Sequence, residues 1–120
     1  MKVSRNFEQS ELSCKCCGFY NFKQDTLEKL QKARDFAGIG FVINSGCRCK
    51  KHNAEVGGKS NSAHLSGRAV DIATPNSNAR FIIIKALIDA GFVRIGYNSK
   101  KKFLHVDNDP SKPQNVLFDY

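Results

Sequence analysis

The chain contains 120 residues, 41% hydrophobic and 25% charged, which suits one domain with a modest core and excludes a multidomain protein. Its 19 Lys and Arg residues against 11 Asp and Glu residues give a formal charge of +8, which favours a polyanionic partner such as bacterial cell wall or nucleic acid. The longest apolar stretches fall well short of the roughly 18 residues that a membrane helix needs, so no membrane span is expected.

The first long helix is predicted to begin at Asp25, which forms a capping-box pattern with Glu28. Apolar residues then recur at intervals of three or four, at Leu27, Leu30, Ala33 and Ala37. Gly38 and Gly40 are expected to end this helix.

The middle of the chain predicts two strands with a short helix and a loop between them. Residues 39–44 form an apolar, β-branched run that is typical of a buried strand. A brief helix over residues 49–56 and a polar loop over residues 59–67 are expected next. Residues 68–73 alternate as a strand does, so that Asp71 points away from the apolar side.

The second half of the chain predicts a helix over residues 79–90. Two short strands, residues 92–95 and 102–106, follow and are joined by a turn over residues 96–99. Residues 110–120 are expected to form an irregular tail. The predicted architecture is one α+β domain over residues 1–120, with helices packed on one side of a small, largely antiparallel sheet.

The excess of basic residues has a second interpretation, a solubilising surface, because Lys100, Lys101 and Lys102 fall at the predicted hairpin tip. No aromatic run interleaves with the basic residues as an RNA-stacking sheet requires, so nucleic acid is the less favoured partner. The first residues carry positive charge but no apolar segment behind it, so no signal peptide is expected.

The chain has five cysteines, Cys14, Cys16, Cys17, Cys47 and Cys49. An odd number in a chain without a secretory signal argues against a complete disulfide framework. Three interpretations are open: a four-thiolate zinc site that joins Cys14-x-x-Cys17 to Cys47-x-Cys49, a disulfide between the two clusters, or reduced cysteines packed in the interior.

Three residues suggest a catalytic metal site. His64 closes the polar loop, Asp71 lies on the following strand, and His105 lies on the last predicted strand. If these strands are neighbours, two imidazoles and one carboxylate converge and leave a fourth position of a zinc ion open for water. The spacing alone is weak evidence for a metal site, and by itself it favours a surface histidine and an unrelated aspartate.

A composite pattern makes the metal site more specific. Ser-x-His-x-x-Gly-x-Ala-x-Asp-Ile over residues 62–72 follows Ser-Gly-x-Arg at residues 45–48 and Gly-Gly at residues 57–58. Together they resemble the zinc D-Ala-D-Ala carboxypeptidases and phage peptidoglycan endopeptidases, whose fold is shared by VanX, VanY and the hedgehog signalling domain. The resemblance runs from about residue 7 to residue 107.

The resemblance implies one zinc ion per chain, held by His64, Asp71 and His105 in a cleft of an α+β fold. It also implies hydrolysis of a peptide bond near D-amino acids in cell-wall stem peptides. Arg48 matches an arginine that faces the scissile carbonyl and would stabilise its oxyanion. Ser62 matches a serine that touches substrate near the metal, although a serine that only forms the turn is an equal alternative.

The chain departs from the family pattern at the general base. Many relatives carry Glu three residues before the last zinc histidine, or His two residues before it; here these positions are Lys102 and Phe103. Asp107 is the nearest substitute, because it shares a strand face with His105. Its alternative role is to accept a hydrogen bond from that histidine and fix its tautomer. Asp109 is a more distant candidate for the base.

The sequence therefore predicts a zinc D,D-carboxypeptidase or endopeptidase of peptidoglycan stem peptides, acting as a monomer. Synthesis in the cytoplasm and action at the wall after release, as in a phage lysin, fit the absence of a signal, and anionic wall polymer fits the charge. The alternatives are a catalytically inactive binding module with the zinc fold and a basic nucleic-acid-binding domain.

Overall fold

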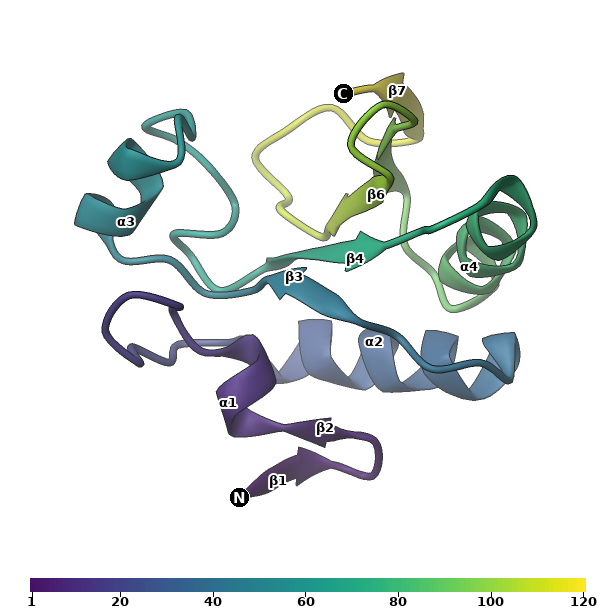
Figure 1. Ribbon diagram of the computed structural model, residues 1–120, viewed down its shortest axis with the longest axis horizontal. Coiled ribbons are helices and arrows are strands. Elements are labelled where there is room, and N and C mark those ends of the chain that lie inside the picture. Colours follow the sequence, from purple (N-terminus) through teal and green to yellow (C-terminus); the bar gives the residue numbers. More distant parts are fainter.

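A five-stranded mixed sheet with two long helices on one side forms the framework of the chain (Figure 1). The computed structural model describes all 120 residues. Its helices and strands are, in chain order, β1 (Lys2–Ser4), β2 (Phe7–Glu8), α1 (Gln9–Leu12), α2 (Gln24–Ala37), β3 (Ile43–Ser45), α3 (Lys50–Glu55), β4 (Ala69–Ala73), α4 (Ser77–Asp89), β5 (Arg94–Asn98), β6 (Phe103–Asp107) and β7 (Val116–Asp119).

The strands of the main sheet lie in the order β3-β4-β6-β5-β7, and only the β5–β7 pair is parallel. The predicted α+β class with a largely antiparallel sheet is therefore confirmed. In the register of the central strands, Asp71 of β4 lies opposite His105 of β6, which in turn lies opposite Gly96 of β5. This register brings two chemically important side chains to the same place although 34 residues separate them.

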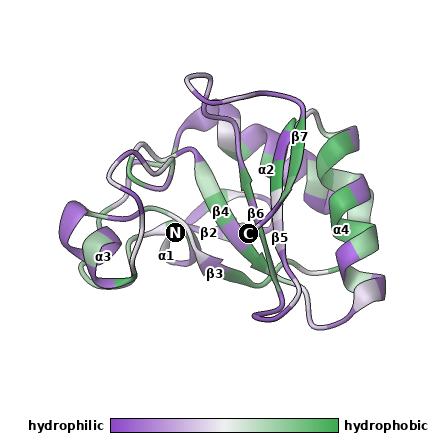
Figure 2. Cartoon of the chain, turned by 90° about the horizontal axis from the view of Figure 1, so that it is seen from above, coloured by the Kyte–Doolittle hydropathy of each residue, from purple (hydrophilic) through white to green (hydrophobic).

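The two long helices form where the sequence predicts them. Buried residues of α2 and α4 pack with apolar strand residues in one core, and α4 is hydrophobic along most of its length (Figure 2). At its amino end α4 is capped by Asn76, whose side chain accepts a hydrogen bond from the backbone of Ala79. No helix combines the length and the apolar character that crossing a membrane requires.

The predicted capping box of α2 is wrong. The helix begins one residue earlier, at Gln24, and its cap position, Lys23, makes no side-chain hydrogen bond. The side chain of Asp25 instead accepts hydrogen bonds from Arg68 and Asn108, which belong to distant parts of the chain. The other end is as predicted, because Gly38 adopts the left-handed conformation with φ 67° that ends the helix.

The central strands have two different faces. Val70 and Ile72 of β4 belong to the core cluster with Leu104 and Val106 of β6. Because side chains alternate along a strand, Asp71 faces the opposite side of the sheet, as predicted. The face without long helices is therefore the one that carries the polar residues.

The predicted irregular tail over residues 110–120 is wrong in part. Val116–Asp119 forms β7, which pairs in parallel with β5 at the edge of the sheet. The backbone of Val116 bonds to Val93, and that of Tyr120 bonds to Tyr97. An unpaired edge of β5 was not visible in the sequence, and it is this edge that orders the tail.

Two predicted strands have bounds that differ from the observed ones by more than one residue. The run at residues 39–44 contributes only Ile43–Ser45 as β3, because the residues before it pass along the sheet without regular pairing. The strand predicted at residues 92–95 is shifted to Arg94–Asn98, so that the turn to β6 falls at residues 99–102. Both differences are shifts of bounds in an otherwise correct order of elements.

The N-terminal segment, in which no helix or strand is predicted, forms the β1–β2 hairpin and α1. Phe7 and Leu12 are buried in the main core. The carbonyl of Leu12 accepts a hydrogen bond of 2.8 Å from the backbone of Cys47. Gly46 passes so close that an added Cβ would lie 2.6 Å from the Leu12 carbonyl oxygen, so only glycine fits there.

Candidate metal centre and active site

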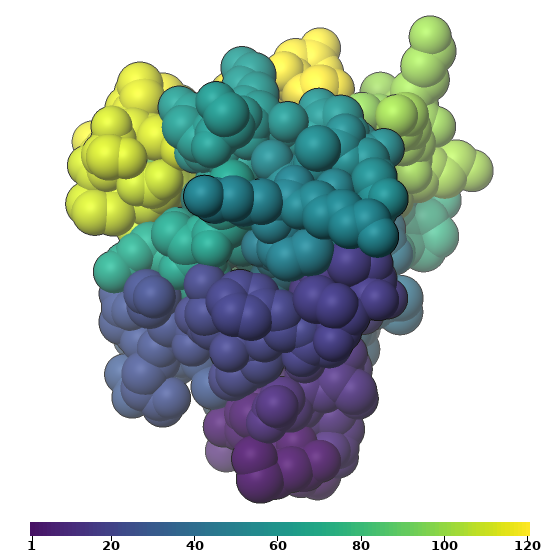
Figure 3. Space-filling view, turned by 90° about the vertical axis from the view of Figure 1, so that its left-hand side faces the viewer, coloured from purple at the N-terminus to yellow at the C-terminus, as the bar shows by residue number.

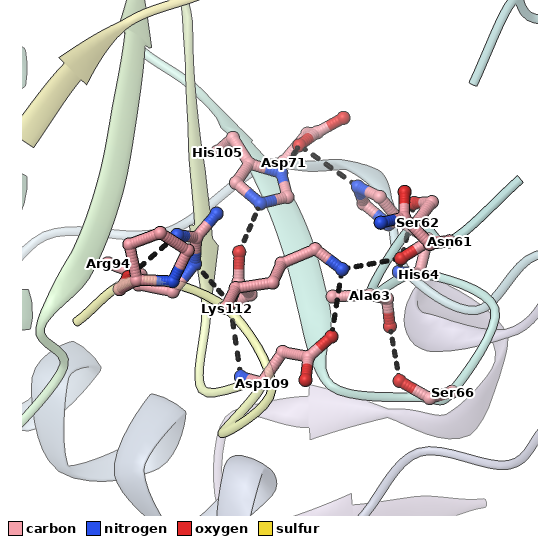
Figure 4. Close-up of polar contacts among 12 residues, drawn as sticks. Asn61, Ser62, Ala63, His64, Ser66, Asp71, Arg94, His105, Asp109 and Lys112 are labelled. Atoms are coloured by element: carbon pink, nitrogen blue, oxygen red, sulfur yellow. Dashed lines mark hydrogen bonds and ion pairs between the residues drawn. The ribbon is translucent and has the colours of Figure 1, made fainter. Parts of the chain in front are cut away.

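Three side chains converge on the polar face of the sheet. His64 comes from the loop before β4, Asp71 from β4 and His105 from β6 (Figure 4). Oδ1 of Asp71 lies 3.2 Å from Nε2 of His64 and 3.1 Å from Nδ1 of His105. All three residues are buried, and their potential ligand atoms lie within 4.8 Å of one another. The structure thus brings together the three residues that the sequence singled out as metal ligands.

The remaining nitrogen of each histidine is bonded to an acceptor. Nδ1 of His64 lies 2.7 Å from the carbonyl oxygen of Gly46, and Nε2 of His105 lies 2.7 Å from Oδ2 of Asp107. Because a carbonyl or carboxylate oxygen accepts, each of these nitrogens carries the hydrogen and donates it. The other nitrogen of each ring then directs its lone pair towards Asp71, as in a metal ligand held by an outer hydrogen bond.

This donor set fits a zinc ion. Two imidazole nitrogens and one carboxylate oxygen are the ligands of many catalytic zinc sites, and three protein ligands leave one position open for water or substrate. The close approach of His64, Asp71 and His105 with both outer nitrogens satisfied is the observation that supports the fit.

The two acidic groups of the site are held in their charged form. Burial alone would raise the pKa of Asp71, but its contacts with the imidazoles of His105 and His64 outweigh burial and hold the pKa well below its usual range. Burial also opposes charge on Asp107, whose pKa is nevertheless lowered by His105 and by Arg94. Both groups therefore present anionic oxygens to the centre.

Arg48 lies beside the metal centre, with its guanidinium fixed on three sides. It donates from Nε to Oγ of Ser45 at 3.1 Å, from Nη1 to Oδ1 of Asn53 at 3.2 Å and from Nη2 to Oδ2 of Asp71 at 3.3 Å. Arg48 is buried and lines the cleft above the centre. Its position is therefore set by contacts with β3, α3 and β4 rather than by solvent.

Ser62 has contacts that serve both of its predicted roles. Its Oγ accepts a hydrogen bond of 3.2 Å from the backbone of His64 and so shapes the turn. The residue also lines the cleft. Forming the turn and facing substrate do not exclude each other here.

Asp107 is wholly buried, at 0% exposure, and both of its oxygens are bonded. Oδ2 faces His105, while Oδ1 accepts hydrogen bonds from Nε of Arg94 at 2.9 Å and from the backbone of Asp109 at 3.0 Å. These contacts are those of a residue that orients a ligand histidine. Arg94, which the sequence did not indicate, completes this arrangement.

The other candidates for the general base lie away from the centre. Asp109 accepts hydrogen bonds from Ser111 and forms an ion pair with Lys112. Lys102 is exposed in the turn before β6, and the ring of Phe103 packs edge-on against Tyr120. Neither of the two positions that carry the base in many relatives offers a proton acceptor.

An open cleft of about 430 Å³ lies over the metal centre. Its lining residues come from the loops before and after α3, from the sheet and from the tail: Arg48, Gly57, Gly58, Lys59, Asn61, Ser62, Ala63, Arg94, His105, Asp107, Lys112, Phe118, Asp119 and Tyr120. The ring of Tyr120 stacks on His105 with centroids 5.4 Å apart. The sequence did not indicate that four tail residues, Lys112, Phe118, Asp119 and Tyr120, form one wall of the cleft. The alternation of Val116, Phe118 and Tyr120 is nevertheless a strand signal.

Comparison with known proteins identifies the family. The family model described as Peptidase M15 matches residues 5–107, which include every residue of the metal centre. The chain belongs to the Peptidase M15 family. A search of curated proteins found no match.

Membership of the Peptidase M15 family confirms the resemblance drawn from the sequence and makes the chain a metallopeptidase in general terms. Peptidases of this family depend on zinc, and His64, Asp71 and His105 are residues that could hold it. The match ends at residue 107, so the tail residues that line the cleft lie outside it.

Proposed function

We propose that this M15 peptidase hydrolyses peptide bonds in the stem peptides of bacterial peptidoglycan. The observation that carries the proposal is the convergence of His64, Asp71 and His105 beneath an open cleft in a chain of this family. The enzyme is a D,D-carboxypeptidase or an endopeptidase, acting as a monomer, since one chain supplies the whole cleft.

His64, Asp71 and His105 are the proposed zinc ligands. When bound, zinc supplies Lewis acidity towards a carbonyl group and a water molecule. The carbonyl of Gly46 and the carboxylate of Asp107 keep the two histidines in the tautomers that leave their inner nitrogens free.

Arg48 is proposed to stabilise negative charge that develops on the carbonyl oxygen of the substrate. Its guanidinium is already oriented by Ser45, Asn53 and Asp71, so little rearrangement opposes its action. Ser62, on the cleft wall, is proposed to contact the substrate backbone.

The lining of the cleft includes two aspartates, Asp107 and Asp119. Because both oxygens of Asp107 are bonded, we assign it the positioning of His105. Asp119 alternates along β7 with Phe118 and Tyr120, whose rings lie beside His105, so its carboxylate faces the other side of the sheet. We therefore assign the role of general base to neither aspartate.

The charge of the molecule suits an acidic wall substrate. Stem peptides carry free carboxylates, and the cleft lining includes Lys59, whose ammonium makes no contact within the chain, beside Arg48, Arg94 and Lys112. The formal charge of +8 also favours attraction to anionic wall polymer. We therefore place the action of the enzyme at the cell wall, after cytoplasmic synthesis and release, as in a phage lysin.

Digestion of purified peptidoglycan, followed by mass spectrometry of the products, tests the proposal and identifies the bond cut. Wild-type protein with zinc is expected to release free D-Ala or new amino termini, whereas Asp71→Ala is expected to release neither. Asp89→Ala, on the exposed surface of α4, is the matched control and should digest as the wild type does. Binding to peptidoglycan without any cleavage would overturn the proposal and favour an inactive binding module.

A further inference from the structure

Four of the five cysteines meet outside the cleft. Cys14, Cys16 and Cys17 lie in the loop that follows α1, and Cys49 immediately precedes α3. Figure 1 shows this loop beneath α3, and in Figure 3 the same N-terminal segment packs directly against the teal residues around α3. The four sulfur atoms all lie within 4.8 Å of one another.

The distances between the sulfur atoms distinguish a metal site from a disulfide. Sγ of Cys16 lies 3.4 Å from that of Cys49 and 3.6 Å from that of Cys14, and Cys14 and Cys49 are 3.8 Å apart. A disulfide requires about 2.05 Å. A zinc ion bound tetrahedrally to four sulfurs at about 2.3 Å each holds them about 3.8 Å apart. The three distances among Cys14, Cys16 and Cys49 are close to that value, and Cys17 lies within 4.8 Å of each of them.

The backbone supports this arrangement. The amide of Cys49 donates a hydrogen bond of 3.4 Å to Sγ of Cys14, and that of His52 donates one of 3.4 Å to Sγ of Cys49. Outer hydrogen bonds of this kind orient metal ligands. The loop itself is closed by a bond of 2.7 Å from Cys14 to the carbonyl of Phe19, and Gly18 takes a φ of 79° that favours glycine.

We propose that Cys14, Cys16, Cys17 and Cys49 bind a second zinc ion, distinct from the one in the cleft, in a closed four-thiolate structural site. Binding releases the thiol protons to solvent and leaves a net negative charge on the site. Basic residues adjoin the cysteines in the chain and offset this charge: Lys15, Lys50 and Lys51.

Cys47 does not belong to the site. Its side chain is buried in the hydrophobic core, and its sulfur accepts a hydrogen bond of 3.4 Å from the backbone of Asn21. The four-thiolate interpretation based on spacing therefore chose one wrong ligand, because Cys47 and Cys49 point to different sides of their loop. Four ligands and one core cysteine account for the odd number of thiols.

The four-thiolate site lies next to residues that belong to the cleft or orient its ligands. Cys49 directly follows Arg48, and the same loop supplies the Gly46 carbonyl that orients His64. A metal ion that joins Cys49 to the loop after α1 therefore holds the segment that contains Arg48 and that orients His64 through Gly46. This consequence rests on the proposed function, whereas the metal site itself does not.

Metal analysis of the purified protein tests the proposal. Wild-type protein is expected to contain two zinc ions per chain. The variants Cys16→Ser and Cys17→Ser are each expected to contain one, and both should fold because these residues are exposed and outside the core. Cys47→Ser is the matched control, a thiol lost outside the site, and should keep two. His64→Ala should lose the cleft ion and keep the thiolate ion.

Cobalt substitution gives a second measurement, and its result for the wild-type protein does not depend on the folding of a variant. Cobalt bound by thiolates gives an intense sulfur-to-metal charge-transfer band in the near ultraviolet, which ligation by His and Asp does not give. We expect this band in wild-type protein and in His64→Ala. Its absence from both, or mass spectrometry that finds disulfides among the four cysteines, would overturn the proposal whatever the outcome of the peptidoglycan digestion.

Discussion

Nε2 of His105 lies 2.7 Å from Oδ2 of Asp107, two residues further along the same strand. Residues two apart on a strand face the same side, so the carboxylate lies behind the imidazole as seen from Asp71. Arg94 of the neighbouring strand holds the other oxygen of Asp107 at 2.9 Å. A continuous chain of hydrogen bonds and ion pairs therefore links the candidate metal centre to the guanidinium of Arg94.

Asp107→Asn should weaken zinc binding in the cleft, because the amide is a poorer acceptor for the His105 hydrogen and its NH₂ group opposes Arg94. Outer partners of metal ligands are worth about 10–100-fold in metal affinity or activity. Competition with a zinc chelator measures the affinity, and added zinc should restore part of the activity. A variant with wild-type zinc affinity and no turnover would instead make Asp107 the general base.

Asp119→Asn should leave kcat and zinc content unchanged, because Asp119 alternates along β7 with Phe118 and Tyr120 and its carboxylate faces away from the metal centre. Steady-state kinetics on a stem peptide, with metal analysis of the same samples, checks both statements. Asp89→Asn on α4 is the control, and a kcat lowered by Asp119→Asn alone would contradict this orientation.

Arg48→Lys should lower kcat by about 10²–10³-fold, the range for the loss of one donor that stabilises an oxyanion. Lysine keeps the charge but cannot make the three directed contacts to Ser45, Asn53 and Asp71. The ratio of the effects on kcat and KM separates transition-state stabilisation from simple substrate binding. An effect confined to KM would contradict this role, and Arg80→Lys on α4 is expected to behave as the wild type does.

Leu87→Ala should destabilise the fold by about 2–5 kcal/mol, because Leu87 is fully buried between α4 and the sheet and its loss leaves a cavity. The neighbouring Ile88 is 54% exposed, so Ile88→Ala should change the free energy of unfolding by no more than about 0.5 kcal/mol. Urea unfolding of the two variants provides the comparison. Similar losses in both would show that α4 packs differently.

Asp109 should make stability depend on pH in the acid range. Burial opposes its charge, but hydrogen bonds from Ser111 and the ammonium of Lys112 outweigh this and lower its pKa to about 2. Because the folded pKa lies below the unfolded value of about 3.9, the stabilisation is complete above about pH 4 and is lost as the pH falls towards about 2. Asp109→Asn should therefore lose less stability than wild type between about pH 5 and about pH 2 in urea unfolding. Equal losses in the two proteins would contradict the prediction.

The sequence predicted best the features that depend on neighbours along the chain. The alternation around Asp71 and the periodicity of α2 and α4 are local consequences of strand and helix geometry, and both are found. The pattern around His64 and Asp71 was specific enough to identify the family, because the metal centre draws on several short motifs.

What the sequence did not reveal depends on contacts between distant segments. The tail became β7 because β5 offers it an unpaired edge, and nothing within residues 110–120 indicates that partner. Whether Cys16 or Cys47 joins the other three cysteines depends on how the loop after α1 meets the loop before α3. The capping box predicted for α2 is wrong for the same reason, since the side chain of Asp25 accepts hydrogen bonds from the distant residues Arg68 and Asn108.

The parallel pairing of β7 with β5 adds to the cleft a wall that lies outside the family match. The family match ends at residue 107, while Phe118, Asp119 and Tyr120 form part of the cleft wall. The ring of Phe118 occupies the space over Gly96, where any larger residue would push against it. Substitutions in β7 or at Gly96 are therefore expected to change the shape of the cleft without altering the proposed ligands of the metal.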